Sequence, residues 1–356
     1  MKGVYIIQRK SNGVSTPFGK IATQKKLHIK RGVCKNSGGF IMQTIMSIFP
    51  VIATVVAVIL AILLLKQYLR RKRIYQLVWF ISLVMFSVAA GFETMSEFVG
   101  WDHGIFIIYR IYIVLSAALV AVMGAGALYL VLQKNVFSPK ILLAIDAILL
   151  GIMIFFGWTM TLSSITDYSA MVFGAMEYTV AGAVVYAILI GIAFLIGKDW
   201  EAKKRNLLHG HIYLAYVIIF TLWMGVYAAV AQVTSADFEP GIAVAGKAMA
   251  QHVRNFSPLL TVTGSFLLIG VAFFSFLKTK FRFNLLIALG GLIMAIAGAI
   301  ARTGAEFGNI LYLGEAVSVL LLYKGFVDSD KIIKAKEEWI QENEVALGQD
   351  SETSVD

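Results

Sequence analysis

The sequence predicts an all-α fold, a polytopic transmembrane helical bundle of about nine spans with the N-terminus outside and the C-terminus cytoplasmic. Hydrophobic residues make up 59% of the 356-residue chain and charged residues only 15%, whereas soluble domains carry about 25% charged residues. Apolar segments follow one another along the chain, each with the roughly 20 residues that a helix needs to cross a hydrocarbon core. The connectors between them alternate in Lys and Arg content, which orients the spans.

Nine apolar segments, each bounded by charged or turn-forming residues, give the predicted spans in chain order. They cover residues 45–65, 77–99, 104–132, 141–162, 178–197, 211–232, 258–277, 285–303 and 310–327. The first span ends at the basic run 66–73, and a turn at Asp102-His103 joins the second span to the third. Pro50 and Pro258 lie near the starts of spans, where a missing backbone N–H costs little.

Positive charge is concentrated in every second connector. Fifteen Lys and Arg residues lie in the connectors 66–73, 133–140, 198–205 and 278–282 and at Lys324. The opposite side of the predicted membrane, with its edges, holds four: Arg110, Lys247, Arg254 and Arg302. Lys and Arg accumulate on the cytoplasmic side of membrane proteins. The bias therefore predicts the stated orientation, and we expect the cell (cytoplasmic) membrane as the location.

Charge also divides the chain into three parts. Residues 1–41 hold nine Lys and Arg residues and no acid, although the predicted topology places them outside. We interpret this segment as non-native, with translation starting at Met42; the alternative is a genuine targeting leader. Residues 42–327 form the transmembrane domain. Residues 328–356 form an acidic cytoplasmic tail with nine acids and three lysines, either solvated or carrying one helix around 331–345.

The hairpin of the second and third spans carries ionisable residues inside apolar segments. Such a residue costs roughly 2.5–3.5 kcal/mol near a helix centre on insertion scales, so each one needs a partner or a function. Glu93 and Glu97 lie one helical turn apart, and Arg110 lies at a similar depth in the next span. We therefore expect Arg110 to contact Glu93 or Glu97.

The last hairpin has a similar arrangement at the outer ends of the eighth and ninth spans. Arg302 and Glu306 close the eighth span, and Glu315 lies about one turn into the ninth. We expect Arg302 to lie near one of these two glutamates, because an unpaired buried charge is costly. Asp146 of the fourth span lies instead near the cytoplasmic face, where Lys140 is expected to neutralise it.

These clusters have two interpretations: packing ion pairs that lock hairpins together, or a polar pocket open to the outside. The pocket interpretation gives six ligand-binding candidates: Glu93, Glu97, Arg110, Arg302, Glu306 and Glu315. No catalytic residue, metal site or cofactor is predicted, because the HExxH, GxSxG, Walker and CxxC motifs are missing from the sequence. An enzymatic activity is therefore not expected. His209 and His211 are expected to be solvated at the cytoplasmic end of the sixth span.

Five stretches carry a resemblance: ETMSEFVGW at 93–101, YRIY at 109–112, GAGALYL at 124–130, SPLLTVTG at 257–264 and LYLGEAVSVLLLYKGF at 311–326. They resemble a family of uncharacterised prokaryotic multi-pass membrane proteins with about eight or nine spans, over most of residues 75–327. The resemblance implies a helical membrane protein with a short N-terminus, which favours Met42 as the start. It implies no activity.

The leading functional hypothesis is a carrier or permease-like protein that handles a small polar solute or ion through an outward-facing charged pocket. The glutamates would bind a cation or proton, and the arginines would balance their charge or contact an anion. Two alternatives stay open: a receptor-like sensor that signals through the tail, and a structural or assembly subunit. The expected partners are the lipid bilayer and the solute. The net charge of +10 is too unevenly distributed to indicate nucleic acid, and the sequence does not predict the oligomeric state.

Overall fold

The computed structural model describes residues 48–99, 101, 106–133, 138–163, 171–197, 200–234, 248–301 and 308–352. Within these ranges the chain is helical apart from short turns and one isolated antiparallel bridge between Val233 and Met249. The helices are α2 (Ile48–Arg71), α3 (Ile74–Val99), α4 (Phe106–Gln133), α5 (Pro139–Ser163), α6 (Met171–Ile196), α7 (Ala202–Val230), α8 (Gln251–Arg254), α9 (Phe256–Thr279), α10 (Arg282–Ala301) and α11 (Gly308–Glu352).

In the described ranges, every helix except the four-residue α8 overlaps one of the nine predicted spans. Among the residues that the structure describes, seven helices are long and apolar enough to cross a membrane, and they lie in α2, α3, α4, α7, α8–α9, α10 and α11. The apolar helix found in α6, Gly182–Ile196, is shorter. The prediction of an all-helical fold with long apolar helices is therefore confirmed. The count of nine spans and the sides of the two termini stay predictions.

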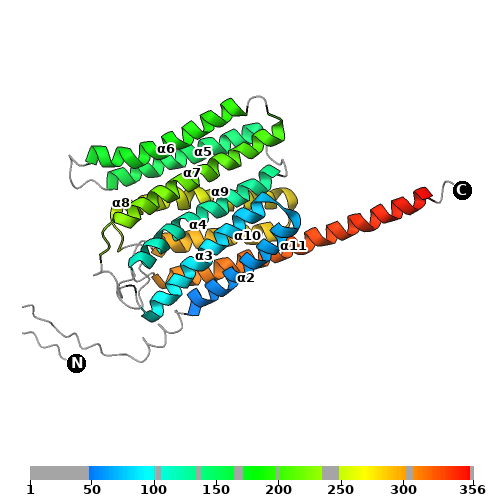
Figure 1. Cartoon of the computed structure of the whole chain (residues 1–356), viewed down its shortest axis with the longest axis horizontal. Coiled ribbons are helices and arrows are strands. Elements are labelled where there is room, and N and C mark those ends of the chain that lie inside the picture. The colour runs from blue at the N-terminus through cyan, green and yellow to red at the C-terminus, as the bar shows by residue number, and fades with distance from the viewer. Residues whose placement is uncertain are drawn as a thin grey trace, which may run out of the picture.

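Six helices form a closed ring. Each contacts the next in the order α2, α3, α4, α9, α10 and α11, and α11 returns to contact α2. The other long helices lie outside this ring: α7 packs against α4, α6 against α7, and α5 against α6 and α9. Figure 1 shows α5 and α6 at one edge of the bundle and α2 at the other. Side chains from several helices therefore meet inside the ring.

Two facing glycines let α4 and α9 approach closely. A Cβ atom on Gly124 would lie 2.5 Å from the carbonyl oxygen of Gly264, and one on Gly264 would lie 2.5 Å from the Cα of Ala121. Both obstacles are backbone atoms, which cannot rotate away, so the contact requires small residues. This contact fixes the spacing between two walls of the ring.

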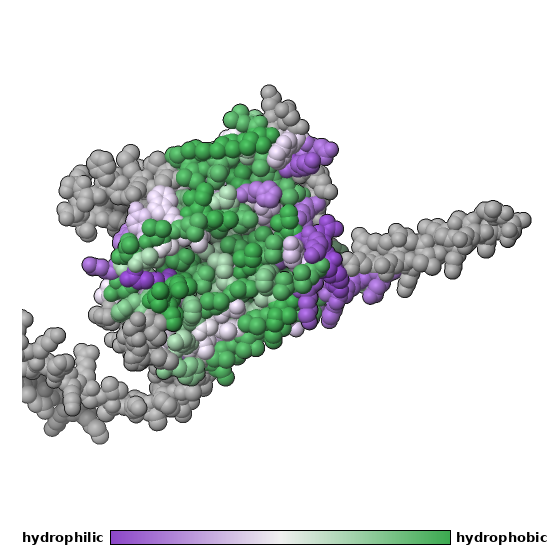
Figure 2. All heavy atoms as spheres, in the orientation of Figure 1, coloured by the Kyte–Doolittle hydropathy of each residue, from purple (hydrophilic) through white to green (hydrophobic). Residues whose placement is uncertain are grey.

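The surface of the bundle is apolar along its middle and hydrophilic at the end from which α11 projects (Figure 2). Large apolar side chains are exposed along the outer faces of the helices, including Ile62, Leu222 and Val226. Soluble monomers rarely expose contiguous apolar patches of more than a few hundred Å², whereas lipid tails solvate such a surface. Lys72 and Lys280 adopt left-handed backbone conformations, φ 53° and φ 57°, directly after α2 and α9.

α11 continues from the ring into the acidic tail as one helix of 45 residues. Its bounds, Gly308–Glu352, include the helix that was expected separately around residues 331–345. Asp330 holds this helix to the C-terminal end of α2, because its carboxylate lies 3.0 Å from Arg71 and 3.5 Å from Arg70. The beginning of the tail is therefore attached to the bundle.

Candidate functional site

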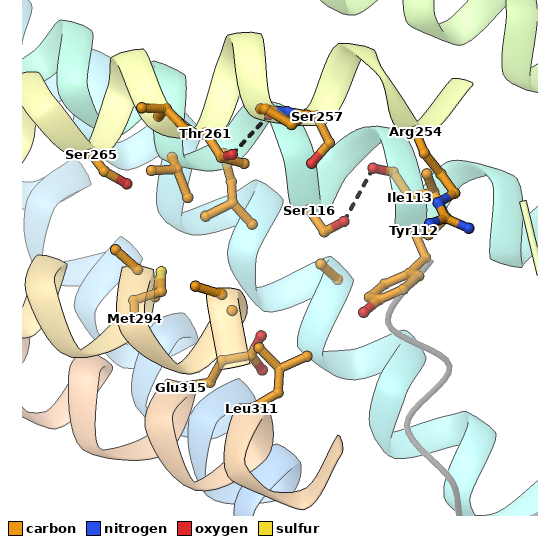
Figure 3. Close-up of a pocket in the computed structure, with 18 of the residues that line it drawn as sticks. Tyr112, Ile113, Ser116, Arg254, Ser257, Thr261, Ser265, Met294, Leu311 and Glu315 are labelled. Atoms are coloured by element: carbon orange, nitrogen blue, oxygen red, sulfur yellow. Dashed lines mark hydrogen bonds between the residues drawn. The ribbon is translucent and has the colours of Figure 1, made fainter. Parts of the chain in front are cut away.

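A cavity of about 440 Å³, here called the ring cavity, lies inside the ring at the end where α3 ends and α4 begins. Figure 3 shows Ser116 and Thr261 on one side of it and Met294 and Glu315 on the other. Many of its lining residues are apolar, among them Phe86, Leu119, Met224, Val262 and Leu311. The polar and charged lining residues are Glu93, Tyr112, Ser116, Gln251, Arg254, Asn255, Ser257, Thr261, Ser265 and Glu315.

Two carboxyl groups from different helices meet at the ring cavity: Glu93 of α3 and Glu315 of α11, here called the acid pair. They lie within hydrogen-bonding reach of each other. Tyr112 of α4 donates its hydroxyl to Glu93 Oε1 at 2.5 Å. The Oε2 atom of each carboxyl is buried and receives no hydrogen bond from a described donor. The structure thus joins two candidate residues that the sequence placed in separate hairpins.

Glu97 lies one turn beyond Glu93 on α3 and is not among the residues that line the ring cavity. Its carboxylate accepts a 3.1 Å hydrogen bond from the hydroxyl of Tyr312 on α11. Tyr112 and Tyr312 therefore supply phenolic donors to neighbouring acids. Neither tyrosine was predicted from the sequence, although Tyr312 lies three residues before Glu315 and therefore on a neighbouring part of the same helix face.

The expected ion pair between Arg110 and a glutamate of α3 is wrong. The Arg110 guanidinium donates instead to the carbonyl oxygens of Ala228, at 2.6 Å, and Ala229. These carbonyls belong to the last turn of α7, where the helix leaves its acceptors unpaired and negatively polarised. Tyr112 faces the acid pair from α4, and two residues correspond to about 200° around a helix. Arg110 must therefore point away from that pair.

Among the described residues that line the ring cavity, the positively charged one is Arg254, the last residue of α8. Its side chain is exposed, which places it at the mouth of the cavity, and it forms no ion pair with any described acid. Arg302 and Glu306 lie outside the described residues. The expected contacts of Arg302 with Glu306 or Glu315 therefore stay predictions.

A stripe of hydroxyl side chains on α9 lines the ring cavity: Ser257, Thr261 and Ser265. They recur every four residues, so they occupy one face of the helix. Thr261 donates to the carbonyl oxygen of Ser257 at 2.8 Å, and Ser116 of α4 donates to that of Ile113 at 3.1 Å (Figure 3). Each hydroxyl oxygen keeps acceptor capacity. This stripe was not predicted from the sequence, although the four-residue spacing of its hydroxyl residues indicates one helix face.

A second polar cluster lies toward the opposite end of the bundle, between α5, α6 and α7. Asp146 is 3% exposed, lies 2.6 Å from Nδ1 of His209, and accepts a 2.9 Å hydrogen bond from Tyr186. The expected neutralisation by Lys140 is therefore wrong, because six residues place Lys140 on another face of α5, where it is exposed. The expectation that His209 is solvated holds only in part, because its side chain is 22% exposed and pairs with a buried acid.

His211 is exposed, as expected, and its Nδ1 atom lies 2.7 Å from the hydroxyl of Tyr129. Within the described ranges, no group of three or more His, Cys, Asp or Glu side chains is placed to hold a metal ion. The acid pair supplies two carboxyl groups, and the third acid near it, Glu97, is engaged by Tyr312. Two buried carboxyl groups with phenolic donors beside them can accept hydrogen bonds from a proton donor or from a cation that carries N–H groups.

Comparisons with protein-family models, with curated proteins and with solved structures found no match to this chain.

Proposed function

We propose that the chain is a carrier of the cell membrane that binds a small polar solute or ion in the ring cavity, with a preference for positively charged solutes. The observation that supports this most directly is the acid pair, two buried carboxyl groups beside a cavity with many apolar lining residues. Buried acids in membrane proteins commonly mark substrate or ion pathways.

The size and lining of the ring cavity favour a small organic solute. Ligand cavities typically measure about 300–1,000 Å³ and combine apolar walls with a few placed polar groups, and this one measures about 440 Å³. Phe86, Met224 and Met294 would contact the nonpolar part of the solute. The acid pair would bind its positive group, and Arg254 at the mouth would disfavour a second positive charge.

Binding is tested first by thermal unfolding of the purified chain with benzylammonium, methylammonium or K⁺. A ligand at 100 times its Kd stabilises the folded state by about 2.7 kcal/mol, so a bound solute raises the unfolding temperature. Glu315→Gln should weaken the effect at least tenfold. Glu338→Gln is the matched control, because Glu338 is exposed on the tail part of α11. If none of these cations stabilises the chain, the proposed preference for cations is refuted.

Transport is tested by uptake of the stabilising cation into proteoliposomes. A carrier should give saturable uptake that Glu315→Gln reduces and Glu338→Gln leaves unchanged. Saturable binding without uptake would refute the carrier and leave a binding protein.

A receptor-like sensor is the second candidate, supported by the continuity of α11. Glu315 and the tail belong to the same helix, which α2 holds at Asp330. Deleting residues 336–356 keeps this attachment, because Asp330 and its partner Arg71 both remain. The deletion should leave uptake intact in a carrier, whereas in a sensor it should preserve binding and abolish the cellular response.

A further inference from the structure

We infer that the acid pair holds one proton between its two carboxyl groups when no cation is bound, and that an organic ammonium releases this proton as it binds. The site then exchanges a cation for a proton. This inference deepens the proposed function and rests on it for the binding of a cation.

The two carboxyl groups of Glu93 and Glu315 contact each other. An ionised carboxylate only accepts hydrogen bonds, so two of them cannot bond to each other. Two carboxyl groups that share one site do not both ionise, because their like charges repel in a medium of low dielectric constant. A single proton between them removes the repulsion and forms the hydrogen bond.

Among the described neighbours of the acid pair, no positive charge compensates the two carboxyl groups. The titratable groups around the pair are Tyr112 on α4, Glu97 on α3 and Tyr312 on α11, all neutral or acidic. α10 lines the ring cavity with Met294, Ala295, Gly298 and Ala299, which carry no charge. Across the cavity, α8 supplies Arg254, which forms no ion pair with either acid. Among the groups that the structure describes here, none balances the second carboxylate, so we assign that role to a proton or a bound cation.

An ammonium group matches the two Oε2 atoms of the acid pair that lack a hydrogen-bond donor. Oε2 of Glu93 and Oε2 of Glu315 are both buried without a donor. An ammonium provides up to three N–H donors and can donate to both oxygens at once. In the exchange, the carboxyl O–H bond breaks and its proton passes to water, while two N–H···O hydrogen bonds form. One positive charge enters and one leaves, so the charge of the site is unchanged.

The proton is measured by calorimetric titration of the purified chain with benzylammonium in buffers of different ionisation enthalpy, which counts the protons released. Release of about one proton per bound ligand is expected, and the apparent Kd should fall about tenfold for each unit rise in pH while the pair holds its proton. Glu315→Gln leaves one carboxylate, so it should bind more weakly and release no proton. Glu338→Gln should behave like the wild type.

A second measurement uses the wild-type chain alone, so it does not depend on the folding of a variant. The infrared C=O band of a protonated, buried carboxyl should be present without benzylammonium and should disappear when benzylammonium binds. If benzylammonium binds but releases no proton, or if the band persists after it binds, the inference is overturned and the proposed binding function still stands. A band that is missing before ligand addition also overturns it. Failure of benzylammonium to bind overturns the exchange, whatever the band shows, and points to the failure of the proposed function.

Discussion

Replacing Gly264 by Ala should destabilise the bundle, although alanine is the better helix former. The added Cβ atom would lie 2.5 Å from the Cα of Ala121 and 2.5 Å from the carbonyl oxygen of Val120. Ordinary contacts of a Cβ atom begin near 3.4 Å, so α4 and α9 must separate by roughly 1 Å. A gap of this size removes a quarter to a half of the dispersion energy of each contact along the interface.

The magnitude follows from two opposing terms. Overpacking a well-packed interface typically costs about 1–3 kcal/mol, and replacing glycine by alanine inside a helix returns roughly 0.5–1 kcal/mol. Gly270 lies on the same helix, is exposed and has nothing within 4 Å of its added Cβ. Gly270→Ala therefore carries the second term alone and is the matched control.

Thermal unfolding of both variants in the same detergent measures the difference. Gly264→Ala should be less stable than Gly270→Ala by about 1–3 kcal/mol. It should also weaken cation binding, because α4 and α9 form two walls of the ring cavity. Equal stability of the two variants would refute the close approach of α4 and α9, and with it the spacing on which the cavity depends.

His209→Ala should destabilise the chain by about 1–3 kcal/mol in thermal unfolding, because it leaves buried Asp146 with only the hydrogen bond from Tyr186. Lys140→Ala should stay within about 0.5 kcal/mol, and the reverse order would restore Lys140 as the partner. Tyr112→Phe removes a donor to the acid pair and should cost about 1–3 kcal/mol, so an unchanged unfolding temperature would contradict that hydrogen bond. A reporter fused after Ser354 should be active in the cytoplasm, and activity only outside the cell would refute the predicted orientation.

The positions of the helices could be predicted because membrane thickness sets the length of an apolar segment. The predicted span 104–132 agrees with α4 to within about two residues at each end, and the predicted span 310–327 lies inside α11. The length of α11 was underestimated, since a polar sequence ends a membrane span without ending a helix. Residues 326–335 contain neither Pro nor Gly, so nothing in the backbone stops it.

The rotation of each helix could not be predicted, and this explains the errors at Arg110 and Asp146. A membrane helix meets apolar groups on both its lipid face and its protein face, so hydrophobic periodicity does not show which face is inside. Arg110 was paired by depth alone, whereas its direction is set by the contact of Tyr112 with Glu93 on another face of α4. The pairing of Asp146 with His209 joins residues 63 positions apart, and no spacing rule connects them.

Because α11 is one continuous helix, a movement at one end of it is transmitted to the other end. At 1.5 Å per residue, Glu315 lies about 22 Å from Asp330, and the end of the helix at Glu352 lies about 33 Å beyond it. The ion pair with Arg71 holds α11 at Asp330, between these two parts of the helix, so α11 would tilt about this point. A rigid tilt that moves Glu315 by 1 Å in one direction would move the far end by about 1.5 Å in the other. A rearrangement confined to the ring cavity would therefore reach the end of the tail enlarged and reversed in direction.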